Sequence, residues 1–160
     1  TDAEGRLVLA DALYHALHDD DHPEPDFLLD FATLTGAARI ALGTECPALF
    51  CNQTQTARDM MDLGEDVNDP VWHLPLFDAY DRYLDAGQAG LSSTGHAGGY
   101  GGAITAALFL RRFTGKKVNW AHIDVMAWNL SARPGRPKGG EAMGLRTSFT
   151  YIKQLAKVAQ

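Results

Sequence analysis

The chain has 160 residues, the size of one domain, of which 46% are hydrophobic, 21% charged and 9% aromatic. These fractions are typical of globular proteins and exclude disordered, collagen-like and coiled-coil classes. No apolar run approaches the ~20 residues that a membrane-spanning helix needs, and the first residues do not resemble a signal peptide. The net charge of -6 has the wrong sign for coating a phosphate backbone. We therefore expect no nucleic-acid partner and no membrane partner.

The two cysteines, Cys46 and Cys51, lie in a segment that is predicted to be a short strand, residues 46–51. Their odd spacing would place the side chains on opposite faces of that strand, so a disulfide between them is not expected. Two buried free thiols, as expected here, fit a reducing cytoplasm. A zinc site is not expected either, because neither a short Cys-x-x-Cys spacing nor a second pair of Cys or His ligands is present. The cysteines thus favour a cytoplasmic location.

Hydrophobic periodicity predicts helices and strands in alternation. In residues 7–17, Leu9, Leu13 and Leu17 recur one turn apart, which predicts a helix. A nearly continuous apolar run at residues 27–34 predicts a strand that is buried on both faces of a parallel sheet. The remaining pattern predicts helices at 36–42, 54–63, 76–84, 103–113 and 141–159, strands at 46–51 and 118–124, an extended connector at 69–75 and a loop at 131–140. This order indicates an α/β protein, a three-layer α/β/α sandwich without a dividing linker.

Carboxylates and an arginine alternate at the start of the chain. If this segment is extended, Asp2, Glu4 and Arg6 point to one face. Two carboxylates there could contribute oxygen ligands to a divalent metal, and the arginine could bind an anion or a developing oxyanion. The alternative is a frayed terminus whose acids favour the dipole of the following helix. Two carboxylates do not complete a metal site, since catalytic zinc takes at least three protein ligands.

Five glycines fall within residues 95–102, directly before an apolar helix. A helix start attracts anions, but the segment lacks the Lys-Ser/Thr of a P-loop, so close packing of backbone around a ligand cleft is favoured over nucleotide binding. A Ser/His/Asp triad could be composed of Ser92 or Ser93 with His96 and Asp124, although no Gly-x-Ser-x-Gly elbow is present. His122 and Asp124 are better interpreted as core or supporting residues of a strand.

Residues 1–12, TDAEGRLVLADA, resemble the signature of the leucyl aminopeptidase (cytosol aminopeptidase) family without its leading Asn. Other matching segments are ATLTGA at 32–37, ALG at 41–43, WHLPL at 72–76, GAITAALFL at 102–110 and HID at 122–124. The segments AWN at 127–129 and ARPGRP at 132–137 are similar to one bacterial branch of that family. The resemblance covers essentially the whole chain.

The resemblance implies a two-metal exopeptidase that removes N-terminal residues, often leucine, from peptides with zinc, manganese or magnesium. A metal-bridging water would attack the scissile carbonyl. Carried over by position, Asp2 would ligate one metal, Glu4 would bridge both, and Arg6 would be a catalytic residue that holds a bicarbonate. The fold implied is an α/β/α sandwich with a mixed, mainly parallel sheet, as in zinc exopeptidases. Family members form hexamers, so a homo-oligomer is expected.

The same resemblance implies a substrate cleft. Thr33, Leu34 and Gly36 match the segment that lines it, with backbone groups of Leu34 and Gly36 suited to binding the peptide main chain. Met126 lies near a position that is Ala in relatives with a roomier pocket, so a preference for leucine does not follow for this chain.

The chain departs from the family pattern in two ways. The family's other metal ligands, one lysine and two aspartates, and its second catalytic lysine lie upstream of the signature, so residues 1–160 match the C-terminal portion of the catalytic domain, with the sheet incomplete on its N-terminal side. Residues 90–93 read GLSS where the family usually has Asp-Leu-x-Asn. We expect the chain alone to be inactive. A non-catalytic binding or assembly module and a nucleotide-binding domain are the alternatives.

Overall fold

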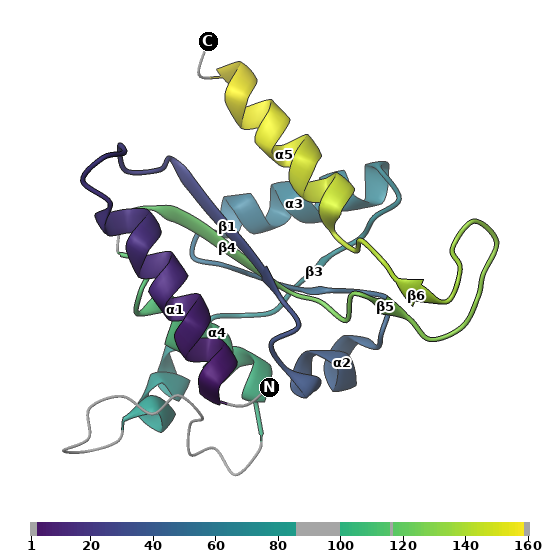
Figure 1. Ribbon diagram of the computed structural model, residues 1–160, viewed down its shortest axis with the longest axis horizontal. Coiled ribbons are helices and arrows are strands. Elements are labelled where there is room, and N and C mark those ends of the chain that lie inside the picture. The colour runs from purple at the N-terminus through teal and green to yellow at the C-terminus, as the bar shows by residue number, and fades with distance from the viewer. Residues whose placement is uncertain (1–2, 86–99, 116, 159–160) are drawn as a thin grey trace.

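The computed structural model of the chain describes residues 3–85, 100–115 and 117–158 and contains a four-stranded mixed sheet in the order β1-β4-β2-β3 (Figure 1). Its strands are β1 (Phe27–Ala32), β2 (Ala48–Cys51), β3 (Trp72–His73) and β4 (Asn119–Asp124). β1 is parallel to β4 and β2 is parallel to β3, whereas β2 and β4 are antiparallel. The predicted mixed, mainly parallel sheet is confirmed.

Helices cover both faces of the sheet, which confirms the three-layer α/β/α arrangement (Figure 1). One layer contains α3 (Thr54–Asp66) and α5 (Leu145–Val158), which pack against each other. The other contains α1 (Ala3–His18), α2 (Gly36–Leu42), α4 (Gly102–Arg111) and the 3₁₀ helix η1 (Asp78–Leu84). Within the described ranges every helix is too short or too polar to cross a lipid bilayer.

The core lies on both faces of the central strand β4. Trp120 packs with the apolar residues of α1 and α4, whereas Ala121 and Ile123 pack with those of α3 and α5. This division follows from the alternation of side chains along a strand. Trp120 and Ile123 are completely buried, and each such side chain stabilises the fold by about 1.5–3 kcal/mol or more. β4 therefore joins the two halves of the core.

Several element boundaries differ from those predicted. β1 is an edge strand in the described part of the chain, and Phe31 is 41% exposed, so the prediction of a strand buried on both faces is wrong. The segment at 76–84 is a 3₁₀ helix, β2 begins only at Ala48, and α5 begins at Leu145 rather than at 141. The loop at 131–140 lies within a hairpin formed by β5 (Trp128–Asn129) and β6 (Gly139–Gly140). Ser92, Ser93, His96 and the first glycines of the 95–102 segment lie outside the described residues.

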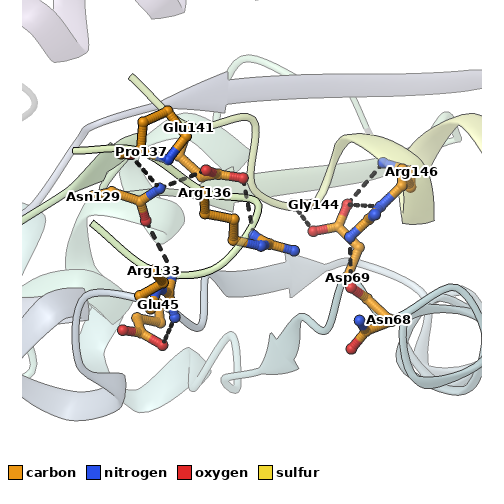
Figure 2. A network of polar contacts seen from close by, with 10 residues as sticks. All are labelled: Glu45, Asn68, Asp69, Asn129, Arg133, Arg136, Pro137, Glu141, Gly144 and Arg146. Atoms are coloured by element: carbon orange, nitrogen blue, oxygen red, sulfur yellow. Dashed lines mark hydrogen bonds and ion pairs between the residues drawn. The ribbon is translucent and has the colours of Figure 1, made fainter. Parts of the chain in front are cut away.

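Charged side chains hold this hairpin in place (Figure 2). Glu141 accepts hydrogen bonds from Asn129 Nδ2 at 2.5 Å and from Arg136 Nη1 at 2.9 Å. Arg133 donates to Asn129 Oδ1 at 2.9 Å and also pairs with Glu45, which follows α2. The hairpin is thereby fastened to the α2 side of the sheet.

Asp69 fixes the start of α5 (Figure 2). Its carboxylate accepts hydrogen bonds from the backbone N–H of Gly144 at 2.9 Å and of Arg146 at 2.8 Å. Its carbonyl accepts one from Thr147 Oγ1. A negative charge at a helix start satisfies otherwise unpaired N–H groups and favours the helix dipole. The connector that follows α3 is thus tied to the last helix.

Candidate active site

The carboxyl ends of β1 and β4 lie side by side, and most of the predicted site residues follow one of them. The strands are parallel and paired in register from Phe27 with Asn119 to Ala32 with Asp124. Ligands of α/β proteins bind at the carboxyl ends of parallel strands. We therefore expect a ligand site at this edge of the sheet.

Asp124, the last residue of β4, determines how the chain continues after β1. Its carboxylate accepts hydrogen bonds from the backbone N–H of Thr35 at 3.1 Å and from Thr35 Oγ1 at 2.6 Å. Thr35 is the N-cap of α2, and its Oγ1 also accepts a hydrogen bond from the N–H of Ala38 at 3.0 Å. Asp124 and Thr35 are both buried. Their hydrogen bonds therefore fix the position of the chain between Leu34 and Gly36.

Arg6 comes from α1 and lies close to the same aspartate. The side chain is only 7% exposed. Burial lowers the pKa of its guanidinium, and the negative charge of Asp124 opposes that shift. Because a guanidinium stays protonated in proteins, this edge of the sheet contains a buried positive charge. Such a charge suits binding of an anion or of developing negative charge.

The segment from Ala3 onward is helical rather than extended, which corrects one prediction. α1 begins at Ala3, so Glu4 and Arg6 differ by roughly 200° around the helix axis and do not share a face. Glu4 is exposed in the first turn of α1, where a carboxylate favours the helix dipole. Asp2 lies outside the described residues.

The described residues do not form a metal site by themselves. Among residues 3–85, 100–115 and 117–158, no group of three or more His, Cys, Asp or Glu side chains could hold a metal ion. Glu4 offers oxygen donors of the kind that magnesium and manganese prefer and zinc accepts, but one carboxylate is too few. The donor chemistry fits a divalent metal, whereas the number of donors does not complete its coordination.

The predicted cleft residues Thr33, Leu34 and Gly36 lie between β1 and α2. Thr33 is exposed. The side chain of Leu34 is 2% exposed and belongs to the core that it shares with α1 and α4. Its side chain is therefore not available to a ligand, which leaves only its backbone groups for such a contact. Gly36 begins α2 and is partly accessible.

Met126 follows β4 and is brought close to α2. Its Sδ accepts a hydrogen bond from Arg39 Nη1 at 3.5 Å. The next residue, Ala127, has a positive φ of 55° and its carbonyl accepts a hydrogen bond from the N–H of Glu141 at 3.1 Å. A non-glycine residue in this conformation is strained, and such strain is common at ligand sites. Met126 is thus held at the same edge as Thr35 and Gly36.

Two features of this region were not predicted from the sequence. The sequence gives no signal for a role of Arg39, because a single arginine in a short predicted helix is not part of any motif. The pairing of His122 Nδ1 with Asp30 Oδ1 at 2.5 Å, inside the core, was also not predicted. Asp30 and His122 are register partners on β1 and β4, so a confident alignment of the two strands would have revealed them.

A large cavity among the described residues lies elsewhere. It has a volume of about 720 Å³ and lies between the start of β1 and the last turns of α5. Its lining is mainly apolar, with Phe27, Leu29 and Ile152 among the residues. It lies at the amino end of β1, whereas Arg6 and Asp124 lie at the carboxyl edge, so cavity size does not identify the candidate site.

Comparison with known proteins agrees with the resemblance found in the sequence. The profile of the cytosol aminopeptidase family, catalytic domain, matches residues 1–149. The chain belongs to the cytosol aminopeptidase family. A "probable cytosol aminopeptidase" from Dechloromonas aromatica is 50% identical over 158 residues, which are 98% of this chain and 30% of that protein.

Solved structures share the fold as well. The crystal structure of the enzyme from Coxiella burnetii is 51% identical, with a TM-score of 0.86 over 96% of this chain and 32% of that one. The bottromycin maturation enzyme BotP in complex with Mn is 35% identical, with a TM-score of 0.84 over 95% of this chain and 33% of its own. The chain therefore spans about a third of the length of the cytosol aminopeptidase relatives that it matches.

Proposed function

We propose that the chain forms the C-terminal portion of a metallo-aminopeptidase catalytic domain that removes N-terminal residues from peptides. Family membership and a buried guanidinium at the sheet edge carry this proposal. The most direct observation is the proximity of Arg6 to Asp124, which in turn holds Thr35 and the cleft segment. This proximity supports a site in which Arg6 binds an anion beside the backbone that would bind the peptide.

Asp2 and Glu4 are the metal ligands of this proposal. Carboxylate oxygens suit zinc, manganese and magnesium, and the Mn complex of the relative BotP supports divalent metal use. When bound, a pair of such metals supplies an activated water for hydrolysis. Ligands from outside residues 1–160 have to complete the coordination, because two carboxylates are fewer than a catalytic metal requires.

Arg6 is the catalytic residue of this proposal. Its guanidinium is buried and permanently charged, so it can hold a bicarbonate close to the reacting peptide. Bicarbonate can accept and return a proton, which is the role it would have here. Burial strengthens the attraction, since the electrostatic interaction is less screened than at the surface.

The peptide substrate is proposed to bind along Thr33, Leu34 and Gly36, with Met126 lining the pocket for the N-terminal side chain. The buried side chain of Leu34 leaves its backbone groups for the peptide main chain. A cytoplasmic location and a hexameric assembly of the whole protein belong to the same proposal. The relatives' description as cytosol aminopeptidases supports the location.

The decisive experiment is hydrolysis of leucyl-anilide in the presence of manganese or zinc. It compares the 160-residue chain with a longer protein in which the family's upstream segment precedes it. We expect activity only in the longer protein, and a large loss of kcat in its Arg6→Met variant. Activity of the 160 residues alone would refute the argument that two carboxylates are too few for a catalytic metal site. Absence of hydrolysis by both proteins would favour a non-catalytic binding or assembly module.

A further inference from the structure

Arg39 reaches from α2 across the candidate site. Its Nη1 lies 3.5 Å from Met126 Sδ, and a Cβ on Gly36 would stand 3.9 Å from its Nη2. The guanidinium thus lies between two predicted cleft residues, one that follows β1 and one that follows β4. It therefore lies beside Met126, which is proposed to line the pocket for the N-terminal side chain of a peptide.

The guanidinium of Arg39 has no carboxylate partner among the described residues: no Asp or Glu oxygen there lies within 4.0 Å of its nitrogens. Its hydrogen-bond acceptor is the thioether of Met126, which accepts only weakly. The arginines that do form ion pairs in the described part of the chain are Arg111, Arg112, Arg133, Arg136 and Arg146. Arg39 is partly buried and still has donors available for an anion.

The surroundings hold this cation in place. Gly36 and Arg39 share the short helix α2, whose start is fixed by the hydrogen bonds of Thr35 with Asp124. On the other side, the left-handed backbone of Ala127 and its hydrogen bond from Glu141 position Met126. The charge of Asp124 is directed toward Thr35 and Arg6. The helix that carries Arg39 and the residue that its guanidinium contacts are therefore both fixed, which limits the entropic cost of binding a carboxylate there.

We propose that Arg39 is a specificity-determining residue that binds the carboxylate of an acidic N-terminal side chain. The protein would then favour peptides that begin with glutamate or aspartate over uncharged residues of the same shape. This inference rests on the proposed function and specifies its substrate class. A bidentate bond between guanidinium and carboxylate is among the stronger polar contacts, and it is geometrically selective.

The test uses the longer protein described above and two matched substrates, glutamyl-anilide and glutaminyl-anilide. These differ in charge and hardly in size, so their kcat/KM ratio isolates the effect of the carboxylate. We expect the unmodified protein to favour the glutamyl substrate by about tenfold, the size of one charge-assisted hydrogen bond. The preference should reside mainly in KM and should decline as salt is added. An aspartyl and an asparaginyl substrate repeat the comparison with a shorter side chain.

Variants at position 39 connect the preference to the guanidinium. Arg39→Met keeps the length of the side chain and removes its charge, so the glutamyl-to-glutaminyl ratio should fall to about one. Arg39→Lys should restore part of it, because the charge returns without the bidentate geometry. Arg58→Met is the matched control: Arg58 is exposed on α3, in the opposite helix layer, and its loss should leave the ratio unchanged (Figure 1).

The outcomes separate this inference from the proposed function. An active protein that does not distinguish the two substrates overturns the role of Arg39 and leaves the aminopeptidase assignment standing. The same holds if Arg39→Met lowers both rates equally, or if only a carboxylate on the second residue of a peptide improves binding. Absence of hydrolysis of every substrate, in folded protein with metal, overturns both.

Discussion

Thr35 makes two hydrogen bonds to Asp124, one from its backbone N–H at 3.1 Å and one from its hydroxyl at 2.6 Å, across a sequence separation of 89 residues. The same hydroxyl caps α2 by accepting from the N–H of Ala38. One side chain therefore joins the end of β4 to the start of α2. The candidate site depends on this junction. Gly36 and Arg39 lie one and four residues after Thr35, and Arg6 lies near Asp124.

Replacing Thr35 by Ala removes the cap and the hydroxyl's hydrogen bond to Asp124 but keeps the one from the backbone N–H. We expect a loss of about 1.5–4 kcal/mol in the free energy of unfolding. Thr35→Ser keeps the hydroxyl and should lose less than about 1 kcal/mol. Denaturant unfolding of the purified proteins measures both. Equal losses in the two variants would show that the methyl group, rather than the hydroxyl, stabilises this junction.

Local sequence patterns predicted the helices and the central strands, since their apolar residues recur with clear periods. The two-residue strands β3, β5 and β6 are too short to show any period, so they were not predicted. The alternation of Asp2, Glu4 and Arg6 is compatible with a strand or a helix, and the structure makes the segment from Ala3 helical. Local patterns do not predict contacts between distant segments. Arg39 and Met126 are 87 residues apart, and neither segment contains a signal that the two side chains are in contact.

A second prediction concerns the buried pair on β1 and β4. Asp30 accepts a hydrogen bond from Trp120 Nε1 at 2.8 Å and pairs with His122 Nδ1 at 2.5 Å. Asp30→Ala leaves both donors buried without an acceptor, and each such group costs about 1–3 kcal/mol. We expect the free energy of unfolding to fall by about 2–5 kcal/mol. Asp30→Asn keeps one acceptor oxygen and should lose less.

Asp62→Ala is the control for this pair. Asp62 is exposed on α3, so its replacement should change the free energy of unfolding by less than about 0.5 kcal/mol. Chemical denaturation can be followed by tryptophan fluorescence, to which the buried Trp120 contributes together with the exposed Trp72 and Trp128. If Asp30→Ala is as stable as Asp62→Ala, the buried pair contributes nothing to the fold.

A third prediction compares two glycines with left-handed backbone. Gly144 (φ 75°) lies before α5, where a Cβ would stand 3.3 Å from Val71 Cγ1, whereas a Cβ on Gly135 (φ 73°) would meet no atom within 4 Å. Both alanine variants carry the same conformational strain of about 1 kcal/mol, and only Gly144→Ala adds crowding. We expect its melting temperature to be several degrees below that of Gly135→Ala. Equal melting temperatures would show that Val71 moves aside without cost.

The last prediction uses the two thiols, both of which are free. Cys51 is 5% exposed, and burial raises its pKa to about 12 from the ordinary value of 9.0. Cys46 is partly accessible, and burial raises its pKa as well. Because the thiolate is the reactive form, at about pH 8 a disulfide reagent should modify Cys46 well before Cys51 in the folded chain. Cys46→Ser should therefore remove the fast phase and Cys51→Ser should keep it.

The same shift makes stability depend on pH. Between pH 9 and pH 12, Cys51 is protonated in the folded chain and increasingly ionised in the unfolded chain, so unfolding releases a proton. The contribution of this thiol is therefore fully present below pH 9 and is lost as the pH rises toward 12. Cys51→Ala lacks this group, so its free energy of unfolding should decline less steeply over that range. Parallel curves for the two proteins, together with equal modification rates of both thiols, would contradict the buried position of Cys51.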